Sequence, residues 1–128
     1  MAEFNNVTTL YVDDEDVNLF LFNANFKNKF NVTTAQSPVK ALDIIDEKHD
    51  EIIIVISDMH MPVMNGVEFI KKAHQKHSNI YYYILSGFDH NPEIEQALEQ
   101  KLISKFLTKP FDVDEITDIV KNVANSTN

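Results

Sequence analysis

The sequence contains neither cysteine nor arginine, and both absences restrict its chemistry. Without cysteine, the chain can form neither a disulfide framework nor a thiolate site. All 11 basic side chains are lysines. Any recognition of phosphate must therefore come from lysine, backbone N–H groups or a metal ion rather than from a guanidinium group.

An excess of positive charge and a long apolar run are also missing. The chain has 20 acidic residues and a formal net charge of −9, a balance that repels nucleic acid and anionic lipid. The longest apolar run, Ile52 to Ile56, is far shorter than the roughly 20 residues of a membrane span. The N-terminus is polar and acidic and has no signal-peptide pattern. We therefore expect a soluble, cytoplasmic protein that binds neither DNA nor membrane directly.

The length and composition indicate one globular domain. A chain of 128 residues with 44% hydrophobic residues can bury a core without cross-links. We interpret residues 1–128 as a single domain, with its core between about residues 7 and 123 and a loose polar tail from Asn125 onward. Because the chain begins with Met1 and stops soon after the last expected helix, we expect a protein that works alone. Two alternatives stay open: the protein could pass its signal on to another protein, or the chain could be one domain of a longer regulator.

The apolar pattern alternates five times between a strand and a helix. The expected strands are residues 7–12, 30–35, 52–56, 80–85 and 105–108. The third consists of β-branched residues throughout, which indicates a central strand buried on both faces, whereas 30–35 is typical of an edge strand. Five strand-then-helix units predict an α/β protein in which a five-stranded parallel sheet is flanked by five helices.

The expected helices carry recognisable start signals. Serine or asparagine followed by proline, at Ser37-Pro38 and Asn91-Pro92, predicts a cap and a first helical residue. Asp112 is expected to cap the last helix. The first helix is expected over residues 15–28. The apolar residues that share one of its faces are Val17, Phe20, Leu21 and Ala24.

Polar side chains follow four of the expected strands, at the points where those strands end. They are Asp13 and Asp14, Asp58, Ser86, and Lys109. Ligands of open parallel sheets bind beyond the carboxyl ends of the strands, so we expect these side chains to converge. Three neighbouring carboxylates repel one another or recruit a cation, and hard oxygen ligands select Mg²⁺ or a similar ion. A carboxylate in such a site can attack a phosphoryl donor and become an acyl phosphate.

Each of these residues has a plainer interpretation when it is considered alone. The acidic run at 13–16 can favour a helix dipole, and Asp58 can be a turn residue. Ser86-Gly87 can be a simple turn, and Lys109-Pro110 an ordinary strand exit. Their joint placement after successive strands favours the functional interpretation.

The residues around these positions resemble the response-regulator receiver family of two-component signalling, and are similar to the chemotaxis response regulator. The resemblance extends from about Val7 to Val123. The segments that carry it are Tyr11-Val12-Asp13-Asp14, Ser57 to Gly66, Leu85-Ser86-Gly87 and Phe106 to Phe111. It implies a flavodoxin-like sheet with strand order 2-1-3-4-5.

The resemblance also implies a metal and a phosphoryl site. Asp58 would accept a phosphoryl group from a sensor histidine kinase or a phosphotransfer protein. Asp13, Asp14, Asp58 and the backbone carbonyl of His60 would hold Mg²⁺ or Mn²⁺. Lys109 would pair with Asp58 or with the phosphoryl oxygens. The protein would then be a signalling phosphoacceptor rather than an enzyme acting on a separate substrate.

A conformational switch is implied by the same resemblance. Ser86 would move to hydrogen-bond the phosphoryl group, and Phe106 would turn inward as the switch aromatic. Phosphorylation adds about one negative charge, which biases an arrangement with two discrete packings. The output face would be the last two helices and the strand between them. The resemblance further implies that His60 and Phe88 occupy positions that tune the lifetime of the acyl phosphate. Considered alone, His60 can equally be an exposed loop residue that contributes only its backbone carbonyl.

The other histidines show no grouping typical of metal ligands, and we interpret them as surface residues. They are His49, His74, His77 and His90.

Two other functions are compatible with this class of fold. Phosphatases of the haloacid dehalogenase type also form an aspartyl phosphate, but they need a carboxylate two residues after the nucleophile, where this chain has His60. A flavin-binding protein needs a phosphate-cradling loop after the first strand, where this chain has the acidic run 13–16. Hydrolysis of small phosphoesters, or colour in the purified protein, would favour these alternatives.

Overall fold

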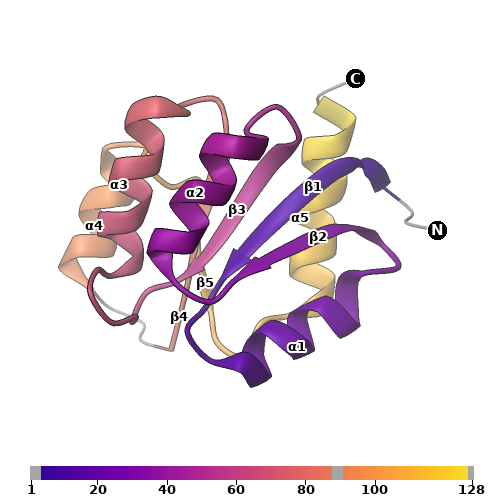
Figure 1. Ribbon diagram of the computed structural model, residues 1–128, viewed down its shortest axis with the longest axis horizontal. Helices are drawn as coiled ribbons and strands as arrows, with labels where there is room; N and C mark the ends of the chain where they lie inside the picture. Colours follow the sequence, from indigo (N-terminus) through magenta and orange to yellow (C-terminus); the bar gives the residue numbers. More distant parts are fainter. Residues whose placement is uncertain (1–3, 88–90, 127–128) are drawn as a thin grey trace.

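The computed structural model describes residues 4–87 and 91–126, and it shows one parallel sheet between two layers of helices (Figure 1). The strands are β1 (Phe4–Val12), β2 (Phe30–Ala35), β3 (Ile52–Asp58), β4 (Tyr81–Ser86) and β5 (Lys105–Thr108). The helices are α1 (Asp16–Phe26), α2 (Pro38–Lys48), α3 (Gly66–Lys76), α4 (Pro92–Glu99) and α5 (Val113–Ser126). The sheet order is β2-β1-β3-β4-β5, and every neighbouring pair is parallel. The predicted fold class and strand order are therefore confirmed.

The sheet separates two apolar clusters. Residues from α2, α3 and α4 pack on one face of the sheet, and residues from α1 and α5 pack on the other. Strand β1 shows how one strand serves both clusters: Leu10 and Val12 belong to the first, and Tyr11 to the second. Successive side chains of a strand point to opposite faces, so a strand covered by helices on both sides is apolar along most of its length.

The predicted helix starts are present as capped N-termini. The side-chain oxygens of Ser37, Asn91 and Asp112 each accept hydrogen bonds from backbone N–H groups two or three residues further along the chain. Helix α3 starts with a reciprocal pair in which Asn65 and Glu68 each accept from the other's backbone N–H group. These contacts satisfy N–H groups that would otherwise have no partner in the first turn.

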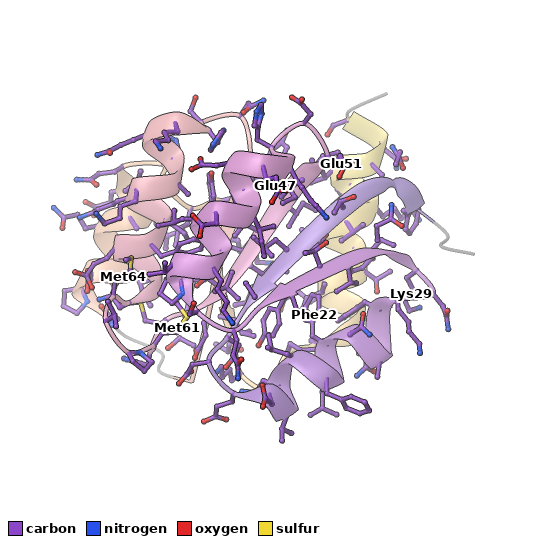
Figure 2. All side chains as sticks on the ribbon, viewed as in Figure 1. Phe22, Lys29, Glu47, Glu51, Met61 and Met64 are labelled. Carbon is purple, nitrogen blue, oxygen red and sulfur yellow. The ribbon has the colours of Figure 1, made fainter. Side chains whose placement is uncertain are left out.

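Helix α1 differs from the apolar pattern in the face that it buries. The side chains of Phe22 and Phe26 are fully buried, and Figure 2 shows Phe22 pointing from the helix toward the sheet. The residues predicted to share a face do so, but that face is turned to solvent. We refer to it as the α1 stripe: Val17, Phe20, Leu21 and Ala24. The helix carries apolar residues on both sides, so the spacing of apolar residues in the sequence could not show which side would be buried.

Several element ends also differ from the predicted ones. Strand β3 extends to Asp58, because Asp58 still pairs with Leu85 of β4. Helix α5 extends to Ser126, so Asn125 and Ser126 are helical rather than part of a loose tail. Among the residues described, no helix combines the length and the apolar character needed to cross a bilayer.

Candidate functional site

Five of the predicted site residues lie at one edge of the sheet, because they end or closely follow parallel strands: Asp13, Asp14, Asp58, Ser86 and Lys109. One oxygen of each carboxylate of Asp13, Asp14 and Asp58 lies within 4.8 Å of the others. The Lys109 Nζ atom lies 2.9 Å from Asp58 Oδ1 and 3.9 Å from Asp13 Oδ2. The structure thus brings together the three carboxylates and the ammonium group.

Asp58 is a buried carboxylate whose environment opposes its ionisation. Burial raises the pKa of Asp58, and the nearby charges of Asp13 and Asp14 raise it further, while the hydrogen bond and the charge of Lys109 act in the opposite direction. Partial burial would lower the pKa of Lys109, but the hydrogen bond and the charge of Asp58 raise it, so Lys109 stays protonated. Three carboxylates against one ammonium group leave this pocket with an excess of negative charge.

Asp13 is fully buried and is held by three hydrogen-bond donors. Its Oδ2 accepts from the Tyr11 hydroxyl at 2.8 Å and from Asn18 Nδ2 at 3.1 Å, and its Oδ1 accepts from the backbone N–H of Glu15 at 3.0 Å. Reasoning from the sequence missed Tyr11 and Asn18. A signal for Tyr11 was present, since residues two apart in a strand point to the same side, and Tyr11 precedes Asp13 by two.

Glycine at position 66 allows the start of α3 to pack against the end of β3. The Gly66 N–H donates to the backbone oxygen of Met59 at 2.8 Å. A Cβ atom on Gly66 would lie 2.5 Å from the backbone oxygen of Asp58 and 2.7 Å from Ile84 Cδ1. This close approach fixes the loop that follows Asp58 and carries His60, whose side chain is exposed.

The family model named "Response regulator receiver domain" matches residues 9–121. The chain belongs to the response regulator receiver family. The receiver is 32% identical over 117 residues to sporulation initiation phosphotransferase F of Bacillus subtilis, a match that covers 91% of this chain and 92% of that protein. It is also 32% identical over 123 residues to the sensor kinase CckA of Brucella abortus, but it spans only 12% of that kinase.

The fold of the receiver is shared with solved structures. A response regulator receiver domain protein from Clostridium thermocellum superposes with a TM-score of 0.83 at 23% sequence identity, over 94% of this chain and 96% of that one. At this identity the likeness concerns the fold alone.

The donor set of the receiver suits a hard divalent cation. Asp13, Asp14 and Asp58 offer carboxylate oxygens, the ligand type that Mg²⁺ and Mn²⁺ prefer. Asp14 is the most accessible of the three to solvent, which would let an ion keep some of its water ligands. Whether the His60 carbonyl joins them stays a prediction.

The two residues of the predicted switch, Ser86 and Phe106, lie on the neighbouring strands β4 and β5. Ser86 is buried at the end of β4, and its backbone oxygen accepts from the Lys109 N–H at 2.9 Å. Phe106 is half-buried on β5 and packs against the cluster that contains α4. Their movement stays a prediction, and Phe88 lies outside the described residues.

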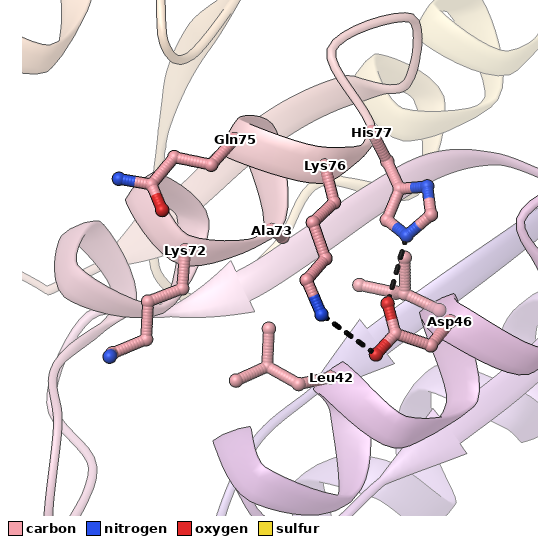
Figure 3. Close-up of a pocket in the computed structure, with 8 residues that line it drawn as sticks. Leu42, Asp46, Lys72, Ala73, Gln75, Lys76 and His77 are labelled. Carbon is pink, nitrogen blue, oxygen red and sulfur yellow. Dashed lines mark hydrogen bonds and ion pairs between the residues drawn. The ribbon is translucent and has the colours of Figure 1, made fainter.

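A second group of charged residues lies between α2 and α3, around a cavity of about 300 Å³ (Figure 3). Figure 3 shows Lys76 and His77 reaching toward Asp46, with His77 Nε2 at 2.9 Å and Lys76 Nζ at 3.6 Å from its oxygens. The His77 side chain is only 13% exposed, so it is half-buried beneath the surface rather than fully on it. His49 is nearly half exposed and stacks on His77, whereas His90 is outside the described residues. This group lies near the C-terminal ends of its helices, whereas the three carboxylates of the acidic pocket lie at or just beyond the C-terminal ends of the strands.

Proposed function

We propose that this receiver is a signalling phosphoacceptor that takes a phosphoryl group from a sensor histidine kinase or a phosphotransfer protein onto Asp58. The contact of Lys109 Nζ with Asp58 Oδ1 at 2.9 Å, beside two further carboxylates, is the observation that carries this proposal. It combines a nucleophile, a fixed positive charge and a set of ligands for a divalent cation. We propose that the protein acts in the cytoplasm on a downstream target protein.

The transfer forms one bond and breaks one bond. An ionised oxygen of Asp58 attacks phosphorus, the new O–P bond forms, and the P–N bond to the donor histidine breaks. The imidazole leaves with the electron pair and later takes up a proton. Mg²⁺ or Mn²⁺ held by Asp13, Asp14 and Asp58 would supply positive charge to the phosphoryl oxygens.

Lys109 has two successive partners in this proposal. Before transfer it pairs with Asp58, which favours the ionised carboxylate that the attack needs. After transfer the same ammonium group can pair with a phosphoryl oxygen, because it is held at the edge of the pocket. Because the chain has no arginine, the side-chain positive charge for this role has to come from a lysine.

The signal would leave the site through Ser86 and Phe106. A phosphoryl oxygen offers the Ser86 hydroxyl a new acceptor, and the movement of Ser86 would open space for the Phe106 ring to turn inward. Phe106 is on β5 between α4 and α5, so this movement would change the face that those helices present.

The experiment is incubation with Mg²⁺ and acetyl phosphate, followed by intact-protein mass spectrometry. We expect a gain of one phosphoryl group that is absent in Asp58→Asn and absent when the divalent ion is chelated. Asp118→Asn, which removes an exposed carboxylate of α5, is the matched control and should react as the wild type does. A phosphoryl group retained in Asp58→Asn would disprove the proposal.

A further inference from the structure

The α1 stripe is an exposed apolar surface on a helix that is already anchored by its other side. Val17, Phe20 and Leu21 are 67%, 70% and 44% exposed, while Phe22 and Phe26 of the same helix are fully buried. Single exposed apolar residues are ordinary, but a contiguous apolar face marks a contact surface. The anchoring of α1 does not need these side chains, so their clustering calls for another explanation.

The spacing of the stripe suits packing against a second helix. Its members follow one another at intervals of three, one and three residues, which places them in one row along an α-helix. The row is about two helical turns long and lies opposite the buried phenylalanines. A partner helix could therefore lie along α1 without disturbing the contacts between α1 and the sheet.

Charge is distributed unequally along α1. Glu15 and Asp16 stand at its start, and Lys27 and Lys29 follow its end; Asp16 and Lys27 are both exposed. Asp16 and Lys27 are eleven residues apart, close to three helical turns, so they flank the same side of the stripe. In sequence order, this surface is acidic, then apolar, then basic.

A surface with that order is complementary to itself when two copies run antiparallel. The acidic start of each helix then faces the basic end of the other, and the two apolar rows meet between them. Self-complementarity is the requirement for a two-fold interface, and charged residues beside an apolar seam set the orientation of paired helices. A foreign partner would need a matching order of charges, whereas a second copy supplies it without any further assumption.

We propose that two copies of this protein associate through α1, with the stripes in contact and with Asp16 of each copy beside Lys27 of the partner subunit. The association is weak, because each stripe has four side chains and specific stable interfaces usually bury far more surface. Each copy also carries a formal net charge of −9, which opposes the association.

The stripe lies next to the acidic pocket. Helix α1 begins two residues after Asp14, and Leu21 lines a cavity of about 100 Å³ together with Lys109 and Pro110. A second copy on α1 would therefore obstruct the approach of a protein phosphodonor to Asp58. Pairing and the binding of a protein phosphodonor would then oppose each other, and by linkage each would weaken the equilibrium affinity of the other by the same factor. This consequence, unlike the pairing itself, rests on the proposed function.

The pairing is tested on the unphosphorylated full chain, without a phosphodonor, by sedimentation equilibrium from micromolar to millimolar concentration. We expect the average mass to rise with concentration toward that of two chains. Phe20→Glu should weaken association about tenfold or more, since it places a charge in the seam. Val39→Glu makes the same change at an apolar residue of α2 that is 53% exposed, on the other face of the sheet, and should leave association unchanged.

The orientation is tested by exchanging charges. Asp16→Lys alone and Lys27→Asp alone should each weaken association, because like charges then face one another, and the double variant should restore it. A protein that stays monomeric, a dimer unaffected by Phe20→Glu, or a double variant without recovery would overturn the inference. If the protein is monomeric and Phe20→Glu slows transfer from a kinase, the stripe is a phosphodonor surface and the inference is wrong. The reaction with acetyl phosphate needs no contact with α1, so its failure would contradict only the proposed function.

Discussion

The Tyr11 hydroxyl donates a 2.8 Å hydrogen bond to Asp13 Oδ2 inside the core. The Tyr11 ring also stacks on Phe22 of α1, with ring centroids 4.3 Å apart and an interplanar angle of 7°. Burial, together with the charge of Asp13, raises the pKa of Tyr11 well above its ordinary value, so the hydroxyl keeps its proton. Tyr11 therefore connects a carboxylate of the acidic pocket to the helix that carries the α1 stripe.

We predict that Tyr11→Phe lowers the free energy of unfolding by about 1.5–3 kcal/mol, the usual contribution of a hydrogen bond to a charged group. The ring and its stacking on Phe22 are kept, so the loss reports the hydroxyl alone. Asp13 also becomes less firmly oriented, and we expect weaker binding of Mg²⁺. Urea denaturation and calorimetric titration with Mg²⁺ measure the two effects.

Tyr82→Phe is the matched control for that substitution. The Tyr82 hydroxyl donates at 2.8 Å to the backbone oxygen of His77, a neutral acceptor. We expect a smaller loss, about 1 kcal/mol, and no change in the binding of Mg²⁺. Equal losses in the two variants would show that the charge of Asp13 is not what makes the Tyr11 bond strong.

We predict that Gly66→Ala destabilises the protein by about 1–3 kcal/mol, the usual cost of overpacking. The new methyl group would lie 2.5 Å from the backbone oxygen of Asp58, so either α3 or the end of β3 has to move. We expect phosphorylation by acetyl phosphate to slow as well. Gly87→Ala is the control, because a Cβ at Gly87 meets nothing within 4 Å; a similar loss there would contradict the steric explanation.

We predict that Asp58→Asn unfolds at a higher urea concentration than the wild type at neutral pH without divalent ions. Because burial and then the neighbouring carboxylates raise the pKa of Asp58 in the folded state, its ionisation is less favourable there than in the unfolded chain. The protonated Asp58 side chain therefore contributes its full stabilisation below the pKa of the unfolded chain, about 3.9. This stabilisation is lost as the pH rises through the pKa of Asp58 in the folded state.

The gain for Asp58→Asn should be about 0.5–2 kcal/mol, the usual result of relieving an unfavourable charge. It should shrink as the pH falls into the acid range, and it should shrink when Mg²⁺ is added, because the ion stabilises the wild type preferentially. A variant less stable than the wild type at neutral pH would show that the pairing with Lys109 outweighs burial and repulsion.

We predict that Asp46→Asn lowers stability at neutral pH and that this difference disappears in acid. The hydrogen bond from His77 is the main cause that lowers the pKa of Asp46, so the folded state favours the ionised carboxylate. The resulting stability is present above the unfolded pKa, about 3.9, and is lost as the pH falls through the folded pKa. Urea midpoints measured across the acid range test this, with Asp43→Asn, an exposed carboxylate of the same helix, as the control.

Local chemistry explains why many elements could be predicted. Proline after Ser37 and Asn91 fixes the backbone at two helix starts, and the β-branched run from Ile52 to Ile56 predicts a central strand. These signals depend on neighbours in the sequence, and they are also sufficient to predict that Asp13, Asp14, Asp58 and Lys109 reach one edge of the sheet. Alternation of strands and helices, with the usual right-handed crossovers, leaves few other topologies.

Contacts between distant segments decided what the sequence could not. Helix α1 has apolar residues on both sides. Its Phe22 side is the buried one because the Phe22 ring contacts the rings of Tyr11 on β1 and Phe30 on β2. The donors that hold Asp13 come from both β1 and α1.

The sequence by itself determined the elements, the class of fold and the set of acidic and basic residues at the sheet edge, because backbone propensity and apolar period are local properties. Only the tertiary structure decided which side of α1 is covered, how Asp13 is oriented and how closely Lys109 approaches Asp58. Those features depend on distances between atoms of separate elements, which are set when the helices pack on the sheet.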